Sequence, residues 1–524
     1  MSGGEAALSS RRFRVGLVVG SLRQPRWVHR LVAALDALPG VEIVPIVESV
    51  RRKRGVPLVR VYAALDRLVY AKPEDALSES ALAFRLGEPS AIGLDATGNE
   101  AGSASMDRLR ALDLDVAVRL GVDEEPLRGA DLARRGVLSL RHGTGDDGLR
   151  EVLLAEPVTA TELVRLGSVA SQDAVLDRSW SQTDSTSLHA SRERLAAKGG
   201  SMLLRAIRRL REDRPARAPY PASPVEGRVA AVATARGLVR LATRRAREVG
   251  LRLCFEDGWI IAAQRPPTWP PDPTRFEPWE PPPGMLWADP FPFVYGGRLH
   301  VFVEEAALDA PRAHLSVIEV GGDGRPGAAR RILERPYHLS YPFVFEAGGQ
   351  IYLVPETAEN RTIEIYRCRV FPDQWELAGV LVSGIRAADA TLLEHAGRWW
   401  IFACVAIEDA LPLDELHLFH APGPLGPFEP FAANPVVSDV RSARPAGRIF
   451  RHGDAWIRPA QDGSGRYGRA VRFERIVRLE PSGYEEREVA SLEPGWSPGV
   501  RAVHTWNACE QLAMVDLVRR RRRF

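Results

Sequence analysis

The chain has 524 residues, more than one hydrophobic core usually supports, so two or three domains are expected. Its composition, with 45% apolar and 26% charged residues, is globular, and a net charge of +3 is too small to indicate nucleic-acid binding across the whole surface. Four widely spaced cysteines give neither a zinc-site nor a disulfide pattern, so we expect no metal, and the sequence identifies no cofactor.

The N-terminus places basic residues before a short apolar run. That run, VGLVVG, leads directly into SLRQPRW, so we interpret it as a buried first strand and not as a signal peptide. No stretch of about 18 apolar residues is present to span a bilayer. A cytoplasmic protein is therefore the default expectation.

Residues 1–206 are predicted to form an α/β domain. Short apolar runs alternate with helical segments from Arg14 to about Leu210, and GADLARRG (129–136) is one of the segments interpreted as helical. This alternation predicts a parallel sheet with helices on both faces. Ligands of such sheets bind beyond the carboxyl ends of the strands, which points to the loops after Gly20, Gly121 and Leu140.

Two basic segments lie outside the predicted domains. Residues 207–250 contain a Pro-rich linker and a basic amphipathic helix, and residues 519–524 form a basic tail. We interpret the helix as a solvated face between domains and the tail as solvated. A weak contact with a membrane surface, through either segment, is the alternative.

Residues 251–518 repeat one design. A small or polar residue, usually beside a proline, precedes a strand, a tight turn and a second aromatic-rich strand. The repeats recur about every 50 residues, a spacing typical of propeller blades. Five copies predict a five-bladed β-propeller, in which LCFEDGWIIAAQ (253–264), interpreted as an isolated hairpin, supplies the strand that closes the ring with the last blade. The copies are anchored at Pro290, Pro342, Ala390, Pro445 and Pro498.

The repeat motifs also resemble a known family. ADPF, YHLSYPFVFE, VPE, FPDQW, RPAGRIF and RPAQD with the following Tyr467-Gly468 resemble the N-terminal domain of plant glucosamine inositolphosphorylceramide transferases and its bacterial relatives. That domain is similar to the five-bladed propellers of arabinanase- and levansucrase-like glycoside hydrolases. The resemblance implies a carbohydrate setting. The transferase catalytic domain of the plant proteins has no counterpart in this sequence, so their activity does not follow.

The N-terminal half resembles the formyltransferase fold through GVLSLRHG (136–143). Gly136 and Val137 match the family strand, but Arg141 stands at the catalytic histidine position, with His142 one place later. Ser139 replaces the asparagine, and Ala170 lies where the catalytic aspartate belongs. Formyl transfer needs a base and oxyanion donors, and only His142 is left as a candidate. We therefore expect a degenerate or repurposed domain, with amino-sugar N-formyl transfer as an alternative.

Glycoside chemistry on a propeller requires two facing carboxylates. Asp289 matches the general base of the hydrolase-like propellers, Asp389 enters the same pocket, and Glu356 is the candidate acid, its pKa raised by aromatic surroundings. The structural alternative is that such carboxylates bind backbone amides of a neighbouring blade and only fix the ring.

Further polar residues in or beside the motifs are candidates to bind sugar hydroxyls or a phosphate. They are His338, Tyr341, Arg444, Arg458, Gln461, Asp462, His504 and Asn507. The expected partner is a sugar, a nucleotide sugar or a glycolipid, and no nucleic acid.

Three classes of function follow. The first is a carbohydrate-active protein, of transferase type, that acts in the synthesis or modification of a cell-surface glycan or glycolipid. It is favoured because a cytoplasmic hydrolase would meet little polysaccharide. The others are a glycoside hydrolase that uses Asp289 and Glu356, and a non-catalytic sugar-binding or scaffold protein.

Overall fold

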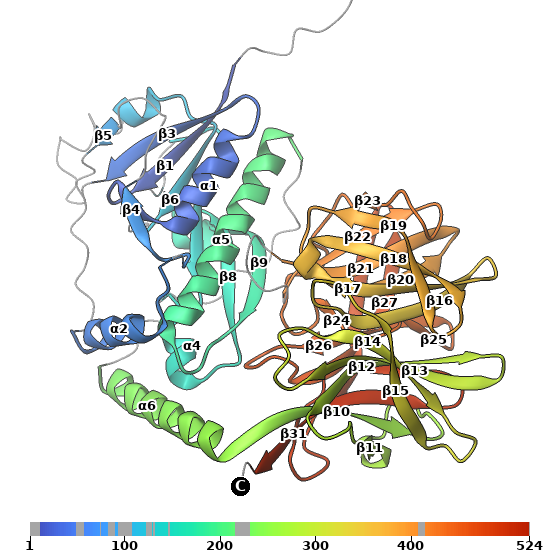
Figure 1. Cartoon of the computed structure of the whole chain (residues 1–524). Coiled ribbons are helices and arrows are strands. Elements are labelled where there is room, and N and C mark those ends of the chain that lie inside the picture. The colour runs from blue at the N-terminus through green and yellow to red at the C-terminus, as the bar shows by residue number, and fades with distance from the viewer. Residues whose placement is uncertain are drawn as a thin grey trace, which may run out of the picture. The chain divides into compact units, whose positions relative to one another are not determined.

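The structure is a computed structural model that describes residues 11–48, 57–73, 75–81, 90–92, 107–121, 128, 132–144, 147–214, 231–406 and 414–522. The chain forms two compact units, Met1–Thr243 and Arg244–Phe524 (Figure 1). The division falls inside helix α6 (Ala231–Cys254), which extends beyond the predicted linker. Among the described residues, no helix is both long enough and apolar enough to cross a membrane.

The first unit contains a seven-stranded mixed sheet in the order β5-β3-β1-β6-β7-β8-β9. The first five of these strands run parallel, as predicted, whereas β7 pairs antiparallel with β8 and β8 pairs antiparallel with β9. A connection as short as the one from β8 to β9 permits only an antiparallel pair. The strands are β1 (Phe13–Val19), β3 (Val41–Glu48), β5 (Ser90–Ile92), β6 (Val116–Leu120), β7 (Val137–His142), β8 (Val158–Arg165) and β9 (Ala174–Gln182), and β2 (Arg23–Pro25) pairs with β4 (Glu79–Ala81) beside them.

Two helices of the first unit, α1 (Arg26–Asp36) and α5 (Leu188–Arg211), pack against one face of this sheet. On α1 the buried side chains are Val28, Leu31 and Leu35, a helical spacing that gives one apolar face. The helices α2 (Pro57–Tyr70) and α4 (Leu149–Leu154) share a smaller core with α5 and the first half of α6. The helix predicted over 129–136 is wrong for its described part, since residues 132–136 form a turn and an isolated bridge.

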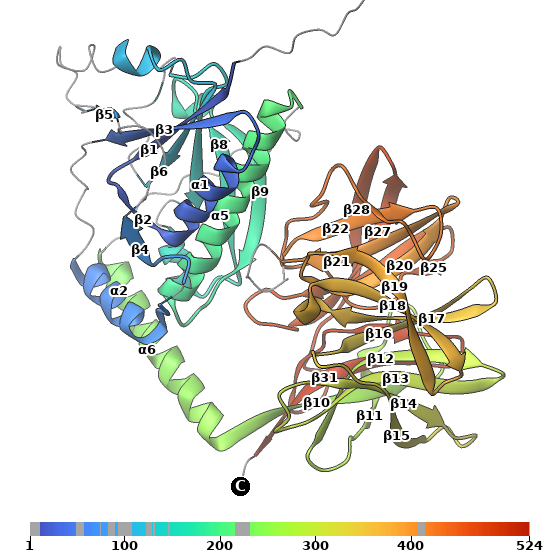
Figure 2. The same ribbon diagram turned by 45° about the horizontal axis from the view of Figure 1, so that its top comes forward.

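The second unit is a five-bladed β-propeller, as the repeat predicted. Its antiparallel sheets follow one another around a common axis, and the first strands of successive blades contact one another (Figure 1, Figure 2). Blade one contains β12 (Met285–Tyr295), β13 (Arg298–Ala307), β14 (His314–Val320) and β15 (Pro326–Leu333); blade two contains β16 (Ser340–Ala347), β17 (Gln350–Thr357), β18 (Thr362–Val370) and β19 (Gln374–Ser383). Blade three contains β20 (Ala387–His395), β21 (Arg398–Val405), β22 (Leu416–Ala421) and β23 (Glu429–Pro430); blade four contains β24 (Arg444–Pro445), β25 (Phe450–His452), β26 (Ala455–Asp462), β27 (Ala470–Glu480) and β28 (Gly483–Leu492).

The first hairpin of each of the first three blades turns at a tight pair of residues with positive φ. Gly296-Gly297 and Gly348-Gly349 have φ values of 56° and 76°, and of 58° and 72°. In blade three the pair is Ala396-Gly397, at 51° and 72°. Two residues in the left-handed region match the twist of a two-residue hairpin, which is why glycine dominates these turns.

The fifth blade is built from both ends of the propeller sequence. Strand β10 (Phe255–Gln264) pairs along its full length with β31 (Ala513–Arg522), so the predicted closing strand is confirmed, although it is a single strand. β11 (Glu277–Trp279) extends this sheet beyond β10, and β29 (Val500–Ala502) and β30 (Trp506–Ala508) pair with β31.

The basic run at the C-terminus is part of this fifth blade, and the prediction of a tail from residue 519 is wrong for the described residues. Arg519 to Arg522 lie opposite Gly258 to Phe255 in the β10–β31 pair. Arg519 forms an ion pair with Glu280 at 2.7 Å and Arg520 with Asp257 at 2.8 Å. Acidic side chains on neighbouring segments thus hold these arginines on the blade.

Candidate functional site

The first strands of three blades share one irregularity at the propeller axis. The register of the antiparallel pair shifts between Ala288 and Phe291, between Ser340 and Phe343, and between Ala388 and Thr391. One residue in each bulge has positive φ: Asp289 at 49°, Tyr341 at 47° and Asp389 at 56°. A bulge changes the direction of a side chain, and left-handed backbone at non-glycine residues is strained. The bulge therefore recurs in three blades as a feature of the ring itself.

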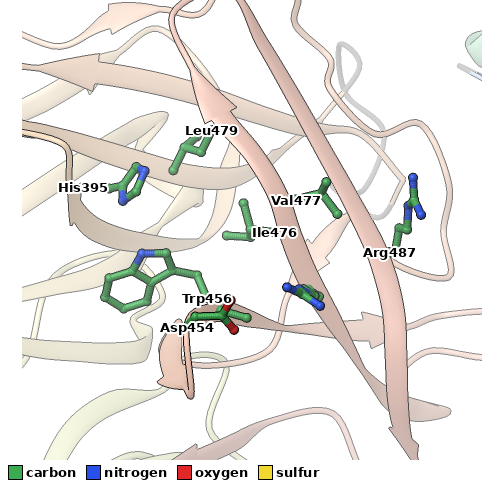
Figure 3. A pocket seen from close by; sticks show the side chains of 9 residues that line it. His395, Asp454, Trp456, Ile476, Val477, Leu479 and Arg487 are labelled. Carbon is green, nitrogen blue, oxygen red and sulfur yellow. The ribbon is translucent and has the colours of Figure 1, made fainter.

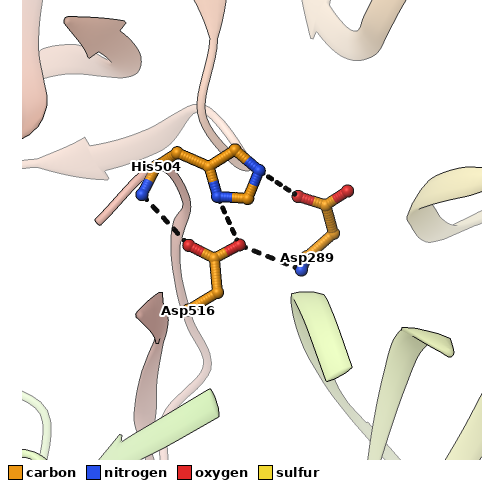
Figure 4. A group of neighbouring side chains, drawn as sticks. All are labelled: Asp289, His504 and Asp516. Carbon is orange, nitrogen blue, oxygen red and sulfur yellow. Dashed lines mark hydrogen bonds and ion pairs between the residues drawn. The ribbon is translucent and has the colours of Figure 1, made fainter. Parts of the chain in front are cut away.

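Asp289 joins blade one to blades two and five. Its carboxylate accepts a hydrogen bond from the backbone N–H of Tyr341 at 3.0 Å, and its own N–H donates to Asp516 at 3.0 Å. The ring of His504 lies between the two aspartates, with Nδ1 2.6 Å from Asp516 and Nε2 3.5 Å from Asp289 (Figure 4). The backbone contacts fit the ring-fixing interpretation of Asp289.

The three side chains of this triad differ in the direction in which their pKa values are shifted. Burial lowers the pKa of His504, but Asp516 and Asp289 outweigh this effect and raise it above its usual range. Burial works against ionisation of Asp516 too, yet His504 and the backbone amides of Asp289 and His504 keep its pKa low. Asp516 and His504 therefore form a buried ion pair, whereas burial raises the pKa of Asp289 well above its usual range.

The same three side chains are the group of potential metal ligands among the described residues, with ligand atoms within 4.8 Å of one another. A metal needs a neutral imidazole nitrogen. Here both ring nitrogens of His504 face carboxylates, and the pKa of His504 is raised, so the triad fits a protonated histidine better than a metal ion.

Arg444, on the first strand of blade four, joins blades two, three and four. Its guanidinium lies 2.5 Å from Asp389 and 3.4 Å from Glu356. Gln461 Nε2 donates to the same Asp389 carboxylate at 2.8 Å. The predicted ligand-binding residue Arg444 thus has acidic partners within the propeller itself.

Glu356 and Glu304 occupy equivalent positions on the second strands of blades two and one. Glu356 pairs with Ser340, and Glu304 pairs with Ala288, in each case the residue before the left-handed position. Sequence reasoning missed Glu304. The signal was available, because the interval from Glu304 to Glu356 equals the interval from Asp289 to Tyr341.

The two glutamates are the carboxyl groups of the cluster that reach solvent. Their side chains are 15% and 14% exposed, and Arg444 is 13% exposed, whereas Asp389 and Asp289 are 1% and 6% exposed. Burial and the neighbouring Glu356 raise the pKa of Glu304 to about 8, and Glu304 shares a hydrogen bond with Asp289. Burial and Asp389 raise the pKa of Glu356 well above its usual range, despite Arg444.

Aromatic and histidine side chains stand beside this cluster. The guanidinium of Arg444 lies 5.2 Å from the ring centre of Tyr467, whose ring is 5.4 Å from that of His504 and edge-on to Trp259 at 6.5 Å. Tyr467 is 44% exposed, so it lies at the surface beside buried charge. His338 is 39% exposed, and its Nε2 lies 3.5 Å from Glu304.

Four of the predicted binding residues have other partners. Arg458 forms an ion pair with Glu486 at 2.7 Å, and Asp462 binds Arg472 at 2.8 Å. Asn507 accepts from Arg448 N and donates to the carbonyl of Pro290, and the hydroxyl of Tyr341 lies 2.7 Å from Thr391. All four are buried, and these contacts give them structural roles within and between blades.

His142 lies apart from the propeller, at the end of β7 in the first unit. Its Nδ1 is 3.1 Å from the hydroxyl of Thr161, and burial lowers its pKa. Arg141 is held by Asp173 at 2.5 Å, and Asp173 also binds Arg128 at 2.7 Å. The side chain at the family's histidine position is therefore committed to an ion pair.

A pocket of about 490 Å³ lies elsewhere, on blade four, and shares no residue with the axial cluster (Figure 3). The term axial cluster denotes Asp289, Glu304, Glu356, Asp389, Arg444, Gln461, His504 and Asp516.

Comparison with known proteins places the axial cluster inside a matched region. Residues 281–517 match the family model described as glucosamine inositolphosphorylceramide transferase 1, N-terminal. The curated glucosamine inositolphosphorylceramide transferase 1 of Oryza sativa subsp. japonica is 33% identical over 229 residues, and that of Arabidopsis thaliana is 31% identical over 237 residues. These matches cover 43% and 44% of this chain and 30% of each relative, so the chain spans under a third of their length.

Solved structures with a similar arrangement include a family 117 glycoside hydrolase of Zobellia galactanivorans, 12% identical with a TM-score of 0.34, which covers 50% of this chain and 90% of that chain. An exo-β-1,3-galactanase of Phanerochaete chrysosporium is 11% identical with a TM-score of 0.32, and covers 42% of this chain and 58% of that chain. The resemblance indicated by the repeat motifs is thus confirmed for residues 281–517, which match the N-terminal-domain family of the glucosamine inositolphosphorylceramide transferases.

Proposed function

We propose that the propeller holds a sugar-containing ligand at its axial cluster, and that the protein acts, as a transferase-type component, in building or modifying a glycan or glycolipid. The observation that carries the proposal is the pair of partly exposed glutamates, Glu304 beside His338 and Glu356 beside Arg444. Neutral carboxyl groups donate and accept hydrogen bonds, which suits sugar hydroxyls. The matched relatives, which are named glucosamine inositolphosphorylceramide transferases, support a carbohydrate setting.

The position of Tyr467 supports the same proposal. An exposed aromatic ring next to Arg444 and the glutamates offers a face on which a sugar ring can stack, while the polar groups fix its orientation. His338 adds a ring nitrogen at the opposite glutamate, Glu304. A ligand at this site would therefore meet one aromatic face and several hydrogen-bonding groups.

A thermal-shift screen of nucleotide sugars, amino sugars and inositol phosphates tests the proposal, because a ligand that binds only the native state raises the melting temperature. At least one ligand is expected to stabilise the wild type and to lose its effect in the double variant Glu304→Gln/Glu356→Gln. The control Glu394→Gln changes an exposed carboxylate of β20 and should keep the shift. The proposal fails if no ligand stabilises the wild type, or if the double variant responds equally.

Glycoside hydrolysis is a second candidate, and the raised pKa of Glu304, about 8, favours it, because a general acid must hold its proton at neutral pH. Against it, the pKa of Asp289, the expected base, is also raised. Incubation with a panel of nitrophenyl glycosides decides the matter. Release of nitrophenol by the wild type and not by Asp289→Asn would support hydrolysis, and no release by the wild type would end it.

Formyl transfer by the first unit is a separate proposal that rests on His142, whose low pKa suits a base that is neutral at pH 7. The test is incubation with formyl-tetrahydrofolate and amino-sugar nucleotides, with His142→Ala as the control. Turnover that disappears in the variant supports the proposal. The absence of turnover in the wild type would leave the domain without this activity.

A further inference from the structure

The pocket on blade four has its own chemistry. It is formed by the end of β20, the β25–β26 turn and strands β26 to β28, and its volume of about 490 Å³ lies within the usual range of small-molecule sites (Figure 3). Its lining combines arginines, a carboxylate, a histidine, an indole and aliphatic side chains: His395, Asp454, Ala455, Trp456, Arg475, Ile476, Val477, Leu479 and Arg487.

Two of these residues, Arg475 and Arg487, are an unusual pair. They lie directly opposite each other in the antiparallel pairing of β27 with β28. Like charges at directly opposed positions destabilise a sheet. Arg487 lies 3.0 Å from Glu485, but no ion pair joins Arg475 to a carboxylate within the described part of the chain. Arg475 is thus the member of this pair that has no ion-pair partner among the described residues.

The pocket takes residues from both faces of blade four: Trp456 pairs with Ile476 on one face, whereas Arg475 pairs with Ile457 and Arg487 on the other. Trp456 is partly buried, and the ring of His395 meets it edge-on at 6.4 Å. The guanidinium of Arg451 lies 5.6 Å from the ring centre of Trp456 and adds positive charge beside the pocket. Ile476 and Leu479 are buried, and Trp456 packs against the core to which they belong. An indole beside aliphatic side chains is suited to the face of a sugar ring.

We propose that this pocket is a second ligand site, which binds a saccharide carrying a phosphate or carboxylate group. The anion lies between Arg475 and Arg487, where guanidinium groups form charge-assisted, bidentate hydrogen bonds. The sugar ring lies against Trp456, and the carboxylate of Asp454 accepts hydrogen bonds from hydroxyl groups. The bound anion relieves the repulsion between the two arginines. The axial cluster takes no part, so this site is independent of the proposed function.

Calorimetric titration of the full chain with four probes tests the proposal: glucose 6-phosphate, glucuronate, glucose and inorganic phosphate. At least one anionic saccharide is expected to bind more tightly than both glucose and inorganic phosphate. Arg475→Gln should weaken that binding by about tenfold or more, since a charge-assisted pair is lost. Trp456→Ala should weaken the saccharide and leave inorganic phosphate unchanged.

Two controls accompany the titration. Arg325→Gln removes an arginine whose side chain is 87% exposed on blade one and should leave binding unchanged. Glu356→Gln alters the axial cluster and should also leave it unchanged. Without ligand, Arg475→Gln should melt at the same temperature as the wild type or higher, because the like-charge pair is removed. Such a result would show that the variant binds more weakly although it is folded.

The proposal is overturned if neither anionic saccharide binds more tightly than glucose and inorganic phosphate. It is overturned equally if Arg475→Gln and Trp456→Ala bind the anionic saccharide as the wild type does. Loss of binding in Glu356→Gln alone would assign the ligand to the axial cluster and reject the second site.

Discussion

At the scale of single residues, five carboxyl groups share two cations at the propeller axis. Asp516 is paired with His504, and Asp389 with Arg444. The remaining groups, Asp289, Glu304 and Glu356, have raised pKa values because burial disfavours their charged form. They are therefore donors as well as acceptors near neutral pH, and the chemistry of the site depends on pH.

Replacement of Glu304 by Gln is expected to flatten part of the dependence of stability on pH. The pKa of Glu304 is raised from 4.5 to about 8 in the folded protein, so between these values the folded state keeps a proton that the unfolded state loses. The contribution of Glu304 to the free energy of unfolding of the wild type therefore falls by up to about 5 kcal/mol as pH rises from 4.5 to 8. Above that range this contribution no longer changes with pH. Urea unfolding at pH 5, 6.5 and 8 measures the difference, and parallel curves for wild type and variant would contradict it.

Replacement of Arg444 by Met is expected to lower the free energy of unfolding by about 3–5 kcal/mol, because Asp389 and Glu356 are left without their cation in a buried site. Arg444→Lys should recover only part of this loss, since a single ammonium group cannot reproduce the contacts of the guanidinium with both Asp389 and Glu356. Arg398→Met, at an exposed position of β21, is the matched control, with little expected change. Equal urea midpoints for Arg444→Met and Arg398→Met would refute the prediction.

Which candidate residues meet at the axis depends on strand alternation, which sequence motifs do not display. Arg458, Gln461 and Asp462 all lie in the same motif on β26. Gln461 reaches Asp389, whereas Arg458 and Asp462, at positions of the opposite parity, bind Glu486 and Arg472. Side chains alternate between the faces of a strand, so neighbours in a motif separate in space. The placement of Asp289, Glu356, Asp389, Arg444 and His504 in one cluster agrees with the sequence-based expectation.

At the scale of elements, the repeat predicted the blades well because each one is a local unit of alternating apolar residues and tight turns. The fifth copy is the exception. Its predicted anchor, Pro498, precedes β29, which pairs with Val518 and Arg519 of β31. The residue of this blade that reaches Asp289 at the axis is instead His504. No proline follows His504, so the proline that marks the starts of blades one, two and four is absent there.

The pairing of β10 with β31 is expected to stabilise the whole ring. Ile260 of β10 is 2% exposed and packs in one core with Val515 and Leu517 of β31. Ile260→Ala should lower the free energy of unfolding by about 2–5 kcal/mol. Leu377→Ala on β19, where Leu377 is 52% exposed, should have a much smaller effect. Guanidinium unfolding followed by tryptophan fluorescence compares them, and equal midpoints would argue against a shared core.

At the scale of the whole molecule, the chain has two compact units. The sequence predicted the fold class of each unit better than the residue at which one unit ends and the next begins. A change from helix-and-strand alternation to blade repeats marked the propeller, but the boundary falls at Thr243 within α6 and not in the Pro-rich segment before it. Because α6 contributes residues to both units, the amino-acid composition does not change at the point where the units divide. The formyltransferase-like character of the first unit stays a prediction.

A fragment of residues 244–524 is expected to fold by itself, because its cores are made of its own blades. Its thermal transition should coincide with one of the transitions of the full chain, and it should bind any axial ligand with unchanged affinity. Differential scanning calorimetry and the thermal-shift screen measure both. A fragment that is soluble but melts without a cooperative transition would show that the first unit is needed for the ring.

The last blade draws its strands from opposite ends of a 268-residue stretch, since Phe255 pairs with Arg522. During synthesis, β10 leaves the ribosome before β31 and stays without this partner until β31 has also been translated. The first unit can acquire its structure in that interval, whereas the ring can be completed only after β31 has been translated. A nascent chain stopped before Ala513 would lack β31 and leave the edge of β10 unpaired and open to aggregation.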